Sequence, residues 1–100
     1  MATVSKALVR ASAATSSATL YTVPSTTTTV VSNIAVTNTA TAGATFTLLL
    51  DDVELQKDST IAANSTAYID LKQVLVATDT IKGLASATTV DFHISGVEIA

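Results

Sequence analysis

Three polar residues near the carboxyl end of the chain have the residue types of a serine-hydrolase triad. Asp91, His93 and Ser95 alternate with apolar residues, so on a β-strand their side chains share one face. Neighbours on one face of a strand have parallel Cα–Cβ bonds about 6.6 Å apart. This separation is too long for the hydrogen bond of about 3 Å by which a histidine activates a serine. We therefore predict a polar surface that faces solvent or another subunit, and no catalytic residues.

A second group that could do chemistry is the acidic cluster of Asp51, Asp52, Glu54 and Asp58. Carboxylate oxygens suit Ca²⁺, but the spacing lacks the central Gly and the terminal Glu of an EF-hand loop. Asp51 and Asp52 directly follow the apolar stretch Ala44–Leu50, and Asp tolerates the left-handed conformation that a tight hairpin turn requires. We predict a solvated turn, with no metal and no cofactor. Calcium binding is the alternative that the sequence leaves open.

The composition limits the size of any site that these residues could form. A chain of 100 residues with 48% hydrophobic and 13% charged residues is neither a disordered acidic tail nor a basic nucleic-acid binder. It can bury one core, but not a core together with a deep, walled cavity. Only four rings, Phe46, Phe92, Tyr21 and Tyr68, are available for burial. So thin a core is commonly supplemented by contacts between subunits, which predicts a homo-oligomer.

Charge is unevenly distributed along the chain. Lys6 and Arg10 are the only charged residues before Asp51, so the first half carries +2, and the second half, with three Lys against eight acids, carries −5. This polarity could guide head-to-tail contacts between copies. Because the basic residues are not clustered, we predict no nucleic-acid partner.

The cellular setting is constrained by what the sequence lacks. It contains no cysteine, which removes disulfides and thiolate chemistry. No uninterrupted run of about 18 apolar residues is present, so we predict no membrane span. The first residues do not show the basic and then apolar regions of a secretory signal, and we expect synthesis in the cytoplasm.

Alternation of apolar and polar residues predicts an all-β chain, because β-branched residues are abundant and helical signals are weak. We expect about seven strands, joined by short hairpin-like connections, in a single antiparallel β-sandwich of jelly-roll or immunoglobulin-like type. The expected strands are Ala18–Val23, Val30–Asn38, Ala44–Leu50, Val53–Gln56, a strand around Tyr68–Leu71, Asp79–Leu84 and Val90–Ile99.

Two parts of this pattern are irregular. Residues 1–17 are expected to form an N-terminal arm or a first strand, and residues 18–100 the sandwich domain. In the last strand Val90, Phe92 and Ile94 alternate on one face, after which Val97 and Ile99 continue the apolar set out of phase. A change of phase at Gly96 predicts a β-bulge in this strand.

Four residues are predicted to contact partners. Alternation places Tyr21 and Tyr68 opposite the apolar faces of their strands, where an exposed ring suits a glycan or a subunit interface. Lys6 and Arg10 give the N-terminal segment a positive charge that could tether it to an acidic neighbour.

Several segments resemble small structural proteins encoded by tailed bacteriophages. They are Leu20–Pro24, Val30–Asn38, Ala44–Leu48 and Phe92–Ile99, so the resemblance extends from about Leu20 to Ile99. Where such proteins usually have Gly after the Pro, this chain has Ser25–Thr27.

The resemblance implies a virion protein present in many copies and without enzymatic activity. We expect it on the capsid as a decoration or cement protein, as a homo-oligomer such as a trimer, in contact with major capsid or tail proteins. The alternatives are a component of the neck, tail or fibre, and a carbohydrate-binding module that attaches to the host.

Overall fold

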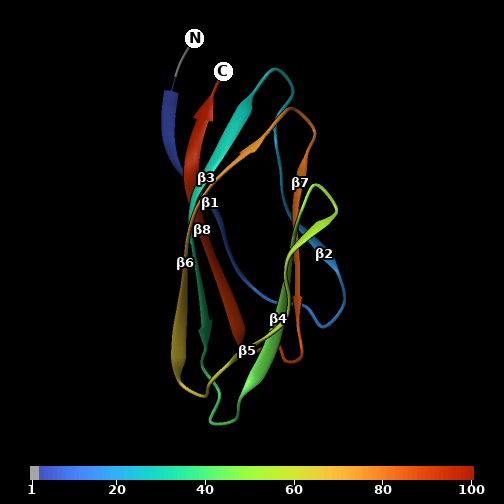
Figure 1. The fold of residues 1–100 in the computed structure, drawn as a ribbon, viewed down its shortest axis with the longest axis vertical. Coiled ribbons are helices and arrows are strands. Elements are labelled where there is room, and N and C mark those ends of the chain that lie inside the picture. The colour runs from blue at the N-terminus through green and yellow to red at the C-terminus, as the bar shows by residue number, and fades with distance from the viewer. Residues whose placement is uncertain (1–2) are drawn as a thin grey trace.

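Alternating apolar and polar residues fold the chain into antiparallel strands that form two layers (Figure 1). The computed structural model describes residues 3–100, with extents of 45 × 21 × 17 Å. The strands are β1 (Thr3–Ser12), β2 (Ala18–Thr22), β3 (Thr28–Asn38), β4 (Ala44–Leu50), β5 (Val53–Ile61), β6 (Ser65–Leu75), β7 (Thr80–Ala85) and β8 (Val90–Ile99).

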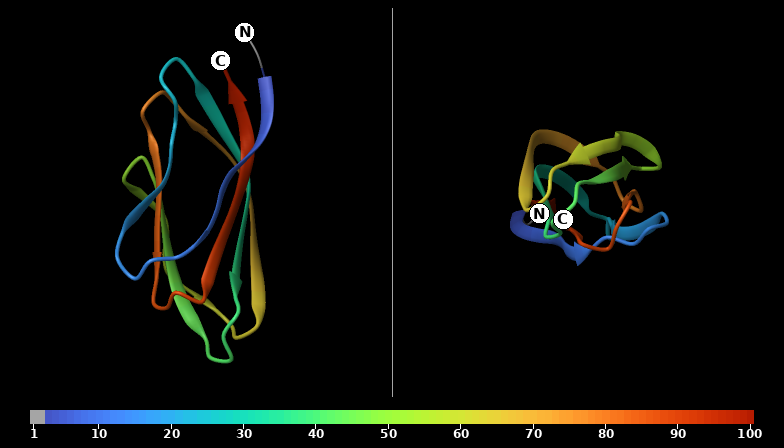
Figure 2. Two further views of the ribbon diagram at one scale, coloured as in Figure 1. Left: turned by 180° about the vertical axis from the view of Figure 1, so that it is seen from behind. Right: turned by 90° about the horizontal axis from the view of Figure 1, so that it is seen from below.

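The strands belong to two four-stranded sheets. Sheet A has the order β1-β8-β3-β6, and sheet B has the order β2-β7-β4-β5. Only β4 and β5 are consecutive within one sheet, and every other connection crosses to the opposite sheet (Figure 2). Eight strands connected in this way form a jelly roll. The prediction of an all-β antiparallel sandwich is confirmed, and of its two variants the jelly roll is the one found.

The core lies between the two sheets and is mainly aliphatic. Phe46 from sheet B and Phe92 from sheet A meet edge to face, with ring centroids 6.3 Å apart and an interplanar angle of 70°. The largest fully buried apolar side chains around them are Ile34, Leu48, Ile81, Ile94, Val23, Val31, Val36 and Val90. The core is therefore as poor in aromatic residues as the composition implies.

The first strand is part of the sandwich. β1 pairs with β8 along its whole length, and Leu8 and Val9 lie in the core. The sequence analysis expected either an arm or a first strand at this end of the chain, and the structure has the strand.

Two strands are longer than predicted. β5 continues through the polar residues Lys57–Thr60 to the buried Ile61, and β6 begins at Ser65. Both are edge strands, with one neighbour and one solvent-facing side, so polar residues do not interrupt them.

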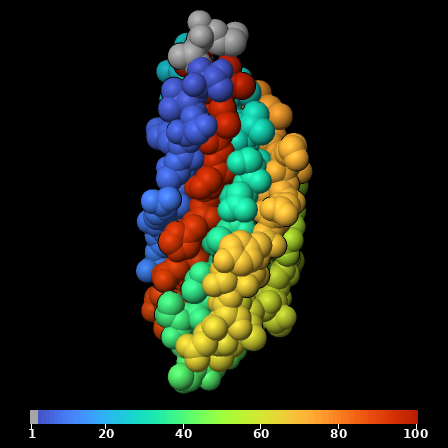
Figure 3. Space-filling view, turned by 90° about the vertical axis from the view of Figure 1, so that its left-hand side faces the viewer, coloured from blue at the N-terminus to red at the C-terminus, as the bar shows by residue number. Residues whose placement is uncertain are grey.

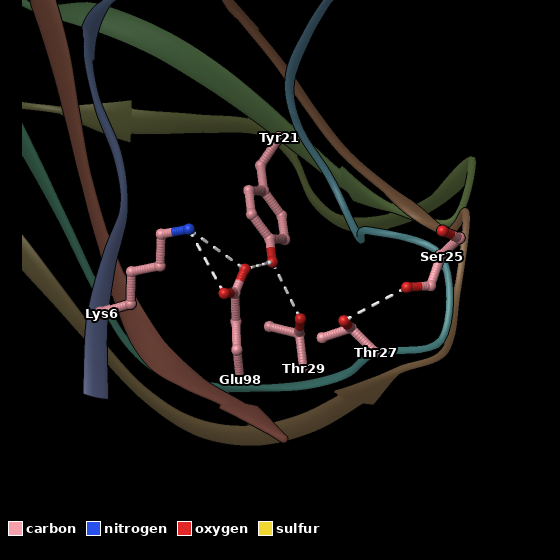
Figure 4. A network of polar contacts seen from close by, with 6 residues as sticks. All are labelled: Lys6, Tyr21, Ser25, Thr27, Thr29 and Glu98. Carbon is pink, nitrogen blue, oxygen red and sulfur yellow. Dashed lines mark hydrogen bonds and ion pairs between the residues drawn. The ribbon is translucent and has the colours of Figure 1, made fainter. Parts of the chain in front are cut away.

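The predicted bulge in the last strand is wrong. β8 is regular through Gly96, and the register breaks lie in its neighbours, at Leu8 in β1 and at Ser32 in β3. A Cβ at Gly96 would collide with the carbonyl oxygen of Val30, so glycine is needed there for close approach of the backbones. Alternation continues past Gly96, and Glu98 faces inward between the sheets (Figure 4).

Across residues 3–100 there is no helix of the length and apolar character that crossing a membrane would require.

Candidate interaction surfaces

A polar network ties the two sheets together at the end of the sandwich where β8 finishes (Figure 4). The Tyr21 hydroxyl, from sheet B, donates a hydrogen bond to Glu98 Oε2 and lies 2.9 Å from Thr29 Oγ1, both in sheet A. Lys6 Nζ lies 3.3 Å from Glu98 Oε1. The network therefore gathers side chains from β1, β2, β3 and β8 around one carboxylate.

The network changes the proton affinities of its members. Burial raises the pKa of the Tyr21 hydroxyl above its usual range, and the hydrogen bond to Glu98 raises it further. The same hydrogen bond holds the pKa of the Glu98 carboxyl below its usual range, and Lys6 contributes to this lowering. At neutral pH the pair is a phenol donating to a carboxylate.

The predicted orientation of Tyr21 is wrong. Tyr21 pairs with the buried Ile81 across the sheet and packs against the core. The register of β2 shifts between Thr19 and Tyr21, so the alternation counted from the sequence changes phase at Leu20. Tyr21 and Lys6 thus bind within the molecule, and their contact with a partner stays a prediction.

Glu98 is the member of this network that the sequence analysis missed. Had the alternation of Phe92 and Ile94 been continued through Gly96, it would have placed Glu98 on the inner face. A lone acid on an inner face needs a partner, and Tyr21 provides it.

Arg10 and Tyr68 lie on a different surface, the outer face of sheet A. Figure 3 shows this face, with β1 in blue and β6 in gold. Arg10 pairs with His93, His93 with Ala35, and Ala35 with Tyr68, so these four residues form one row across the four strands. Tyr68 is 74% exposed. The structure therefore separates the four predicted contact residues into two pairs, one at the end of the sandwich and one on this face.

The residues with the types of a triad share a face, as predicted, but they are not coupled. Asp91 accepts a hydrogen bond of 2.8 Å from Ser12 Oγ, and the carbonyl of Ser95 accepts one from Ser32 Oγ. His93 is exposed, and within residues 3–100 no hydrogen bond joins it to Asp91 or Ser95. The arrangement contains no nucleophile paired with a base.

Of the acidic cluster, Asp51 and Asp52 form the predicted turn, whereas Glu54 and Asp58 lie in β5. Asp51 and Asp52 adopt φ values of 52° and 61°, and Leu50 pairs with Val53 across them. The charge of Asp79 raises the pKa of Asp51 above its usual range.

Two of these acids bind lysines instead of one another. Asp52 forms an ion pair of 2.6 Å with Lys82, and Glu54 one of 3.1 Å with Lys57. Within residues 3–100 there is no group of three or more carboxylates or histidines that could hold a metal ion.

Shallow depressions surround Arg10 on the outer face of sheet A. One of about 370 Å³ lies over β1 and β8 and includes Ser32 and Ser95, and one of about 260 Å³ includes Asp91 and His93. Neither is walled, so this face suits contact with another surface better than enclosure of a small molecule.

The comparisons with known proteins gave matches among solved structures alone. No protein-family model matches the chain, and no curated protein matches it. It is similar to two crystal structures of a pentameric capsid protein isolated from metagenomic phage sequences, with 16% and 17% identity and a TM-score of 0.39 in each case. The match covers 90% of this chain and 59% of each of those chains, so this chain spans about three fifths of their length.

Proposed function

We propose that this protein is a structural component of a bacteriophage virion, and that it decorates the capsid as a cement protein. The observation that carries the proposal is the eight-stranded jelly-roll topology, with sheets ordered β1-β8-β3-β6 and β2-β7-β4-β5. Viral capsid domains share this architecture with lectins and cupins. Because one fold hosts many functions, the surface has to decide between them.

The described surface supports a binding role. The one histidine of the chain, His93, is exposed on a flat sheet face without a hydrogen bond to a neighbouring acid or serine. Two acids near the β4–β5 turn, Asp52 and Glu54, are bound by lysines. The resemblance of Leu20–Pro24 and Phe92–Ile99 to phage structural proteins points to the same class.

The mechanism is mechanical. Several copies, with a closed trimer as the first model, bind where capsid subunits meet and hold them together through sheet faces and edges. An exposed edge strand in a Thr- and Val-rich sandwich also invites pairing with another chain, so coverage by a neighbour would protect it.

The copy number per particle tests this proposal. Mass spectrometry of purified virions of the encoding phage is expected to give tens to hundreds of copies per head, and particles lacking the protein are expected to release DNA at a lower temperature than complete particles. A copy number of about a dozen or fewer, with heads of unchanged thermal stability, would instead place the protein in the neck, tail or fibre.

A carbohydrate-binding role is the second candidate, and the exposed Tyr68 favours it. Aromatic rings on a flat face can stack against sugars, and lectins also use this architecture. On a glycan array, binding that Tyr68→Ala abolishes and Tyr21→Ala leaves in place would support this role. An array without any bound glycan would count against it.

A further inference from the structure

We infer that copies of this chain associate side by side, with the β1 edge of one copy against the β6 edge of the next, so that Arg10 of one copy meets Tyr68 and Asp70 of its neighbour. The inference rests on the homo-oligomer of the proposed function and names its contact. The space-filling view of sheet A shows these two edges on opposite sides of one face, β1 in blue and β6 in gold (Figure 3).

Both strands end their sheet and have an unpaired side. In the order β1-β8-β3-β6 every adjacent pair is antiparallel, so β1 and β6 run in opposite directions. When copies are rotated about an axis parallel to the strands, β1 of one copy therefore lies antiparallel to β6 of the next. The strand pairs within each copy are antiparallel as well, so the inferred contact would continue the same kind of pairing.

The two edges also match in height. Arg10 and Tyr68 are the end members of one cross-strand row, through His93 and Ala35. A closed ring has no rise between copies, so a residue on one edge meets the residue at the same height on the other edge. Arg10 and Tyr68 satisfy this condition.

The side chains at this height have complementary chemistry. Arg10 is exposed and forms no ion pair within residues 3–100, and Tyr68 is 74% exposed. A guanidinium binds the face of a tyrosine ring and also a carboxylate. Asp70, two residues along the same face from Tyr68, supplies that carboxylate, whereas Lys72 on the same strand reduces the net charge of the edge. Val74, 62% exposed, adds apolar area to the β6 side.

The complementarity is between different patches, which distinguishes this contact from a two-fold one. In a two-fold dimer built on either edge alone, β1 would face β1 or β6 would face β6, so Arg10 of one copy would not meet Tyr68 of the other. In the inferred contact each copy contributes one patch to each neighbour, which generates a ring. The angle between neighbours then sets the number of copies.

Cysteine cross-linking tests the contact directly, because the chain has no cysteine of its own. Positions 10 and 68 of one copy are three strand spacings apart, about 14 Å, which exceeds the reach of a disulfide. The variant with both Arg10→Cys and Tyr68→Cys is therefore expected to form covalent oligomers under mild oxidation. Each single variant should remain monomeric on a non-reducing gel. Dimers from either single variant, or no cross-link from the double variant, would overturn the inference.

A charge exchange provides the second measurement. Arg10→Glu and Asp70→Arg are each expected to raise the dissociation constant of the oligomer at least tenfold by sedimentation, and the two together to recover most of this loss. Lys57→Glu, on sheet B, is the matched control and should change the dissociation constant less than twofold. Equal effects of Arg10→Glu and Lys57→Glu would contradict the contact.

The two failures can be distinguished. If the protein is monomeric at every concentration, or if its oligomer is insensitive to Arg10→Glu and Asp70→Arg, the inferred contact is wrong. The copy number on virions would still test the virion role independently. If virions lack the protein and cross-links join positions 10 and 68, the contact stands and the proposed function is wrong.

Discussion

The outer faces of the two sheets differ in how their charges are satisfied. Beside sheet B, Lys82 binds Asp52 at 2.6 Å and Lys57 binds Glu54 at 3.1 Å. On sheet A, Arg10 lies in a row with the exposed Tyr68 and has no ion pair within residues 3–100. A surface whose charges are already paired gains little from a partner, whereas a surface with an unpaired guanidinium and an exposed ring gains more. The difference favours sheet A as the face used in the contact that we infer.

The largest expected effect on stability comes from the core between the two sheets. Phe92→Ala removes a fully buried ring that contacts Phe46 across the core, and it is expected to lower the free energy of unfolding by about 3–5 kcal/mol. Urea unfolding followed by circular dichroism measures this change. Tyr68→Ala, the matched loss of a ring on the outer face, should change the free energy by less than about 0.5 kcal/mol. A similar loss from both variants would show that Tyr68 supports the fold.

The next effect belongs to sheet A alone. Gly96→Ala places a Cβ against the carbonyl oxygen of Val30 and is expected to lower the free energy of unfolding by about 1–3 kcal/mol. Gly43→Ala is the control, because a Cβ there would meet Ile61 O at 3.6 Å, an ordinary contact. Equal unfolding midpoints for the two variants would contradict the close approach of β3 and β8.

The network that joins the sheets predicts a loss of stability in acid. The hydrogen bond from Tyr21 lowers the pKa of Glu98 in the folded state, so Glu98 stabilises the protein above the ordinary value of 4.5. This contribution is lost as the pH falls through the lowered pKa. Glu98→Gln should therefore flatten the decrease in the urea midpoint between pH 5 and pH 3. An unchanged slope would show that Glu98 is not coupled to folding.

The smallest effects sharpen the comparison of the two faces. Lys82→Ala breaks a surface ion pair and is expected to cost about 0–1 kcal/mol of stability, without altering the mass of the oligomer. Arg10→Ala should leave the thermal midpoint within error at a dilution where both proteins are monomeric, and yet shift concentrated protein toward monomer. Light scattering after size exclusion measures the mass of each. A mass change caused by Lys82→Ala would place the interface on sheet B instead.

Local residue patterns predicted much of the fold. Ala44–Leu50 has an apolar residue at every second position and is followed by Asp51 and Asp52, and both the strand and the left-handed turn are present. The lengths of β5 and β6 could not be predicted, because polar residues in an edge strand resemble those of a loop. Residue propensity does not show that such a strand is held in place by pairing with one neighbouring strand.

The site was harder to predict than the fold. Tyr68 is exposed as its alternation predicts, since a regular strand preserves the phase from one residue to the next. Tyr21 follows a register shift, and a shift of one residue exchanges the two faces. Glu98 was missed because Gly96 was interpreted through its conformational freedom. Glycine is required at position 96 because a carbonyl oxygen of a neighbouring strand lies close to it, and this is visible only once β3 and β8 are paired.

The position of β8 between β1 and β3 has a consequence for synthesis. All four strands of sheet B lie within residues 18–85 and can emerge from the ribosome before the last strand is made. Sheet A cannot close until Ile99 is available, because its first strand has only its last strand as a neighbour. Such distant pairing delays the folding of sheet A until β8 has been synthesised. The face that carries Arg10 and Tyr68 therefore forms only after β8 has been made, and a nascent chain that ends before β8 cannot present this face to a partner.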